Sequence, residues 1–109
     1  MVAFQDLDPC DLQRLLEGSD AGVLLVDVRT SAEVARGGIP GAQSISLHLL
    51  PLNASVLDKG RPVVFYCQSG GRSSQACAYL QRQGYDKLYN LRGGVMAWVR
   101  NGLPLGPLG

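Results

Sequence analysis

The segment Val63-Val64-Phe65-Tyr66-Cys67-Gln68-Ser69-Gly70-Gly71-Arg72-Ser73 decides the fold of this chain. Its first four residues form a continuous apolar run, which is typical of a strand buried on both faces in a parallel sheet. A helix is predicted to begin near Ser73, because Ala76, Cys77 and Leu80 recur at three- and four-residue intervals. A strand, a short polar loop and a helix in this order indicate one unit of an α/β fold.

The same alternation extends along the rest of the chain. Residues 23–28 form a second apolar run, and 43–46 and 87–91 are further candidate strands. Helices are predicted from Pro9 to Gly18, from Thr30 to Gly37 and from Val95 to Arg100, and broken helical turns are predicted for 47–57, where a proline interrupts an apolar stretch. The pattern predicts an α/β domain with a mainly parallel sheet and helices on both faces.

Length and composition predict one domain over residues 1–109, with a Pro- and Gly-rich tail at 103–109 that we expect to be irregular. No apolar run approaches the roughly 20 residues that span a bilayer, so we expect no membrane association and a cytoplasmic protein. The net charge is +1 and the basic residues are scattered, which argues against a nucleic-acid partner. We also expect no metal ion and no cofactor.

Cys67 is the leading candidate for a reactive residue. Ligands in parallel sheets bind beyond the carboxyl ends of strands, and Cys67 directly follows the strand at 63–66. The loop Gln68, Ser69, Gly70 and Gly71 can curl so that its N–H groups converge on one anion, while Arg72 and the start of the next helix add positive charge. Such surroundings lower a thiol pKa from about 8.5 and make the sulfur nucleophilic without a base.

The other two cysteines and the single histidine are weaker candidates. An odd number of cysteines in a chain without a secretory signal argues for reduced thiols. Cys77 is predicted to pack in the core, with a role as a resolving thiol as the alternative, and Cys10 is expected to be incidental. His48 could pair with Cys67, but no spacing supports such a dyad.

The chain resembles the rhodanese family. The resemblance covers nearly the whole sequence and rests on three stretches in the family's order: Val26-Asp27-Val28-Arg29 with Glu33 and Gly38-Ile39-Pro40-Gly41-Ala42, then Cys67-Gln68-Ser69-Gly70-Gly71-Arg72-Ser73, and finally Asn90-Leu91-Arg92-Gly93-Gly94 with Trp98. One departure is Gly38, which stands where many relatives have histidine.

The resemblance implies a five-stranded parallel sheet and a two-step reaction. In that reaction Cys67 would take sulfur from a donor such as thiosulfate, hold it as a persulfide, and pass it to a nucleophile such as cyanide or a thiol. The N–H groups from Gln68 to Arg72, with Ser73 in support, would surround the outer sulfur, and the Arg72 guanidinium could hold a sulfonate. Asp27 and Arg29 resemble the family's structural pair and are expected to form a buried ion-pair network with Glu33.

Three other functions are alternatives to sulfur transfer with small molecules. Phosphatases and arsenate reductases share the fold but separate cysteine and arginine by five residues, whereas four separate Cys67 from Arg72. A sulfur carrier, loaded and unloaded by sulfur-relay proteins, would show little turnover with a small-molecule donor and acceptor. A non-catalytic regulatory domain would lack a usable cysteine, and this chain has one.

Overall fold

The computed structural model describes residues 4–18 and 22–108. Its five strands form one sheet in the order β1-β5-β4-β2-β3, and every pair of neighbours is parallel. The strands are β1 (Phe4–Leu7), β2 (Leu24–Asp27), β3 (Gln43–Ser44), β4 (Val63–Tyr66) and β5 (Leu88–Leu91), and the helices are α1 (Pro9–Glu17), α2 (Ser31–Val34), α3 (Leu50–Asn53), α4 (Gly71–Arg82) and α5 (Gly94–Arg100). Two short 3₁₀ turns, Leu47–Leu49 and Ala54–Val56, flank α3.

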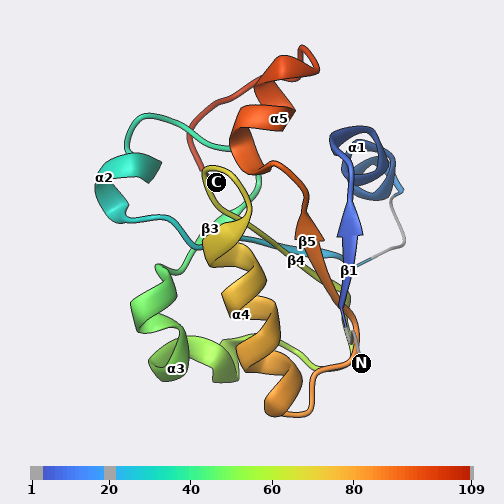
Figure 1. Ribbon diagram of the computed structural model, residues 1–109, viewed down its shortest axis with the longest axis vertical. Helices are drawn as coiled ribbons and strands as arrows, with labels where there is room; N and C mark the ends of the chain where they lie inside the picture. Colours follow the sequence, from blue (N-terminus) through green and yellow to red (C-terminus); the bar gives the residue numbers. More distant parts are fainter. Residues whose placement is uncertain (1–3, 19–21, 109) are drawn as a thin grey trace.

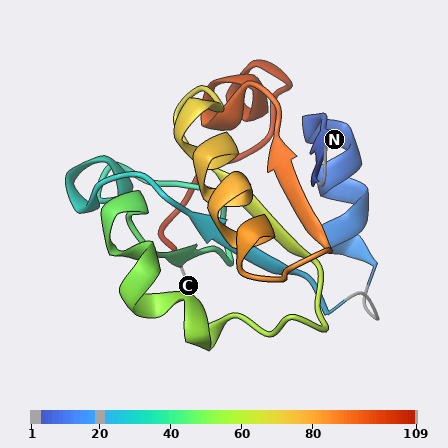
Figure 2. The same cartoon turned by 60° about the horizontal axis from the view of Figure 1, so that its bottom comes forward.

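Helices cover both faces of the sheet (Figures 1 and 2). One buried cluster joins the sheet to α3 and α4, and a second joins it to α1 and α5. Within β4, Val63 and Phe65 belong to the first cluster, while Val64 and Tyr66 belong to the second. Because alternate side chains of a strand point to opposite faces, the continuous apolar run of β4 is needed to fill two cores.

The structure confirms the α/β class and the parallel sheet, but several elements differ from the expectations. Helix α2 ends at Val34 and not at Gly37, and β3 ends at Ser44 and not at residue 46. Strand β1 was not predicted from its residues, because it is short and partly exposed and carries polar side chains in its middle. Helix α4 begins at Gly71 and not near Ser73, since Gly70, with φ of +114°, turns the chain sharply enough to begin the helix earlier. In the described part of the chain no helix is long and apolar enough to cross a membrane.

The tail after α5 lacks regular secondary structure, apart from one bridge, but it packs against the domain. Gly106 and Gly38 exchange two backbone hydrogen bonds of 2.9 Å, and the Trp98 indole donates to the Pro104 carbonyl over 2.8 Å. A Cβ at Gly38 would lie 2.6 Å from Leu108 and 2.7 Å from the Tyr66 hydroxyl. The space that a larger residue at position 38 would need is therefore filled by the tail and by Tyr66.

Candidate active site

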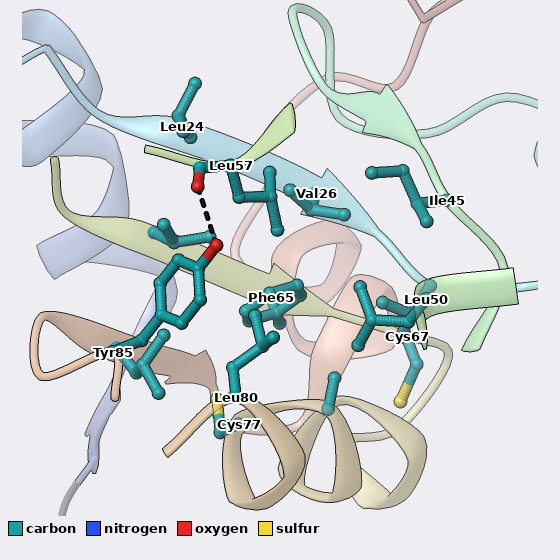
Figure 3. Close-up of a cluster of buried hydrophobic side chains, with 14 residues drawn as sticks. Leu24, Val26, Ile45, Leu50, Leu57, Phe65, Cys67, Cys77, Leu80 and Tyr85 are labelled. Atoms are coloured by element: carbon teal, nitrogen blue, oxygen red, sulfur yellow. Dashed lines mark hydrogen bonds between the residues drawn. The ribbon is translucent and has the colours of Figure 1, made fainter. Parts of the chain in front are cut away.

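Cys67 lies at the carboxyl end of β4, a central strand of the sheet, in the loop that leads into α4 (Figure 1). The residue is 1% exposed. Figure 3 shows its side chain at the edge of the first buried cluster, near Leu50 and the start of α4. The sequence predicted Cys67 and its loop at the carboxyl end of this strand, and the structure places them there.

Helix α5 orients the first peptides of the loop. The N–H groups of Val95 and Met96 donate to the carbonyls of Cys67 and Gln68, over 2.9 and 3.2 Å. In a trans peptide the N–H points away from the carbonyl, so these bonds turn the following N–H groups to the other side of the loop. Gly94 makes the contact possible, because a Cβ there would lie 2.5 Å from both carbonyl oxygens.

Hydrogen-bond donors converge on the Cys67 sulfur. The Gly70 N–H donates to Sγ over 3.0 Å, and the Ser73 hydroxyl lies 3.5 Å from it. Burial alone would raise the pKa of the Cys67 thiol, but bonds from the Ser73 hydroxyl and from the N–H groups of Ser73, Gly70 and Ser69 outweigh burial and hold the pKa below its ordinary value. The loop therefore favours a sulfur anion at this position.

Asn90 is a site residue for which the sequence reasoning found no role. It is 4% exposed on β5, its side-chain carbonyl accepts a short hydrogen bond from the Ser73 hydroxyl, and its amide donates to Asp6 over 3.1 Å. Asn90 begins the stretch Asn90-Leu91-Arg92-Gly93-Gly94, and a buried amide in a strand was the signal that could have drawn attention to it. It fixes the hydroxyl that faces the Cys67 sulfur.

Arg72 forms an ion pair with Glu33. Its two terminal nitrogens donate to the two carboxylate oxygens over 2.7 and 2.8 Å. The Arg72 guanidinium, together with a backbone hydrogen bond from Thr30, lowers the pKa of Glu33 to about 2. The sequence analysis expected the Arg72 guanidinium to bind a sulfonate, but most of its charge is balanced by Glu33.

Asp27 and Arg29 form the expected buried ion pair, 0% and 4% exposed. Arg29 donates to both carboxylate oxygens, with a shortest distance of 2.7 Å, and also to the Gly37 carbonyl over 2.8 Å. The expectation that Glu33 forms a buried network with this pair was wrong, because its salt bridge is to Arg72 and the two side chains are 30% and 35% exposed. Glu33 lies on α2, which is next to the loop that follows Cys67, and its side chain turns to Arg72.

The remaining candidates lie away from the loop. Cys77 is fully buried, and burial raises the pKa of its thiol to about 12, which leaves it unreactive at neutral pH. Figure 3 shows its sulfur near Leu80, separate from that of Cys67, and both cysteines are free thiols. Cys10 and His48 are exposed on α1 and on the turn before α3. None of the three takes part in the hydrogen bonds to Cys67.

Comparisons with known proteins agree with this geometry. The family model of the rhodanese-like domain matches residues 8–101. A protein of Allochromatium vinosum named sulfurtransferase is 56% identical over 93 residues, which are 85% of each chain. The thiosulfate sulfurtransferase GlpE of Stutzerimonas stutzeri is 35% identical over 72% of each chain.

Solved structures show the same fold. The crystal structure of a rhodanese-like domain protein from Staphylococcus aureus is 33% identical to this chain, with a TM-score of 0.84 over 94% of this chain and 97% of that one. On the family match, the relatives and the shared fold, this chain belongs to the rhodanese-like domain family.

Proposed function

We propose that this protein is a sulfurtransferase that carries sulfane sulfur as a persulfide on Cys67. The Cys67 thiolate attacks the outer sulfur of a donor such as thiosulfate, a new S–S bond forms, and sulfite leaves with the electron pair of the broken bond. A nucleophile such as cyanide or a thiolate then attacks the outer sulfur of the persulfide, and Cys67 leaves as a thiolate.

The convergence of N–H groups on Sγ carries this proposal. A persulfide is an anion, as is the thiolate that is released in the second step, and the bonds from Gly70 and Ser73 stabilise negative charge at the sulfur in both. The lowered pKa of the Cys67 thiol increases the fraction of thiolate available for the attack, which reduces the need for a neighbouring base. The reaction needs no second side chain as nucleophile.

The Arg72–Glu33 pair bears on the choice of donor. A dianion such as thiosulfate gains less from a guanidinium that two carboxylate oxygens already occupy. We therefore expect turnover with thiosulfate to show a high KM. A protein-loaded carrier is the alternative function, and it predicts no thiosulfate turnover at all.

Steady-state kinetics with thiosulfate and cyanide test the proposal, with thiocyanate formation as the readout. Parallel lines in double-reciprocal plots are expected, because the persulfide enzyme separates the two half-reactions. Cys67→Ser should abolish turnover, whereas Cys10→Ser, at an exposed position away from the loop, should retain it. Turnover that survives Cys67→Ser would overturn the proposal.

A further inference from the structure

A cavity of about 500 Å³ lies beside the catalytic loop, between α2 and α5. Gln68 contributes to its wall from the loop, and Glu33 contributes from α2. In Figure 1 the loop lies between these two helices. Such a volume falls in the range of small-molecule sites, about 300–1,000 Å³, and it far exceeds the space that cyanide or thiosulfate requires.

One part of the cavity wall is apolar. Val95, Met96 and Val99 contribute from α5, and Leu105 contributes from the tail. Met96, Val99 and Leu105 are 46%, 49% and 42% exposed, so their side chains are open to a ligand. A hydrocarbon segment bound here would remove apolar surface from water, which favours a ligand with an organic body.

The charges in the wall do not balance. Glu33 pairs with Arg72, and Arg29 pairs with Asp27. Arg36 and Arg100 are both exposed, and neither forms an ion pair within residues 4–18 and 22–108. Among the described residues the cavity thus presents two cations without an ion-pair partner next to an apolar wall, and its charge is complementary to that of an anionic ligand.

We propose that the cavity binds an organic thiol with an apolar body and a carboxylate, and that Arg36 and Arg100 select this acceptor by its charge. The inference rests on the proposed sulfur transfer at Cys67. The carboxylate would lie against Arg36 and Arg100 and the apolar body against Met96 and Val99, with the thiolate directed to the catalytic loop.

Sulfur transfer to the organic thiol forms one bond to the outer sulfur and breaks another. The acceptor thiolate attacks the outer sulfur of the Cys67 persulfide, which lies about 2 Å beyond Sγ. A bond forms between the acceptor sulfur and the outer sulfur, the bond to Sγ breaks, and Sγ leaves as a thiolate that the loop stabilises. The product is an organic persulfide anion, and no external oxidant or reductant is needed.

Three thiols of equal chain length test the effect of charge on the transfer rate without a change in size. They are 6-mercaptohexanoate, 6-mercaptohexanol and 6-aminohexanethiol. Cys67 is first loaded from thiosulfate or inorganic polysulfide and the persulfide is verified by intact mass, so failure to load would contradict the proposed function itself. Single-turnover transfer is then followed at equal thiolate concentrations. At low salt the carboxylate should react about three- to ten-fold faster than the alcohol, with the amine slowest, and salt should shrink the differences.

Variants assign the preference to the two arginines. Arg36→Gln combined with Arg100→Gln should bring the carboxylate-to-alcohol ratio close to one, and the double change to Glu should favour the amine. Arg82→Gln removes the same charge from an exposed position on α4 outside the cavity, and it should keep the wild-type ratio. Equal rates for the three thiols, or a ratio that survives the double Gln substitution, would overturn the inference while leaving sulfur transfer at Cys67 intact.

Discussion

Arg72 and Glu33 are joined by two parallel hydrogen bonds of 2.7 and 2.8 Å. The same carboxylate accepts the backbone N–H of Thr30 over 3.0 Å at the start of α2. The Glu33 side chain thus satisfies the backbone N–H of the N-cap residue of α2. It also neutralises the charge of Arg72 in the loop that follows Cys67. This arrangement couples the position of α2 to the loop that holds Cys67.

Replacing Glu33 with Gln should improve the reaction with thiosulfate. The substitution keeps the shape of the side chain but removes the charge that competes with a dianion for Arg72, so we expect KM for thiosulfate to fall about three-fold or more. Steady-state kinetics at low ionic strength measure the change. Arg72→Gln is the matched control and should raise KM, and an unchanged or higher KM in Glu33→Gln would contradict the assigned role of the pair.

Replacing Ser73 with Ala should raise the pKa of the Cys67 thiol. The change removes a hydrogen-bond donor to Sγ and leaves burial, which favours the neutral thiol, in place. The pH profile of alkylation by iodoacetamide should shift to higher pH, and the rate at neutral pH should fall several-fold. The experiment uses a Cys10→Ser background, because Cys10 is exposed while Cys77 is buried. A profile identical to that of the parent would show that the hydroxyl does not act on the thiolate.

Replacing Asn90 with Ala should shift the same profile in the opposite direction. A serine hydroxyl has one proton, and in the structure Ser73 shares its neighbourhood with Sγ and with the Asn90 carbonyl oxygen. Without that acceptor the proton is shared between the thiolate and the Gly70 carbonyl, which lies 3.1 Å from the hydroxyl, so it faces the thiolate more often and the pKa of Cys67 falls. Circular dichroism verifies the fold of the variant, since a buried amide is lost. A shift to higher pH would contradict the proposed competition.

Gly94→Ala should damage both stability and sulfur transfer. Gly94 has φ of +61°, and an added Cβ would meet the carbonyl oxygens of Cys67 and Gln68 at 2.5 Å. Gly102 provides a matched control, because its φ is +76° and nothing lies within 4 Å of its added Cβ. Gly102→Ala should cost about 1 kcal/mol from the left-handed backbone alone, and urea unfolding should show a clearly larger loss for Gly94→Ala. Equal losses would mean that α5 does not constrain the loop.

The sequence predicted the parts of the fold that depend on local pattern. The apolar runs located β2 and β4, and the polar loop after β4 identified Cys67 as the candidate residue, because both signals lie within a few neighbouring residues. Strand β1 was missed because its stability comes from pairing with β5, which is more than eighty residues away along the chain. Tertiary pairing of this kind leaves little local signal.

The same limit applies to the site. Cys67 and its loop were found from sequence because a single segment contains them. The partners that tune the loop come from other elements: Glu33 from α2, Asn90 from β5 and Gly94 from α5. Glu33 was expected in a network with Asp27 and Arg29, since charge and spacing along the sequence do not show that Arg72 is its partner.

The intact mass of the purified protein after incubation with thiosulfate, before and after cyanide, tests the central claim most directly. The account predicts a gain of one sulfur, about 32 Da, on the wild type and on Cys10→Ser and Cys77→Ser, its removal by cyanide, and no gain on Cys67→Ser. A cyanide-sensitive gain that persists in Cys67→Ser would contradict the account, because the persulfide would then be carried by another residue.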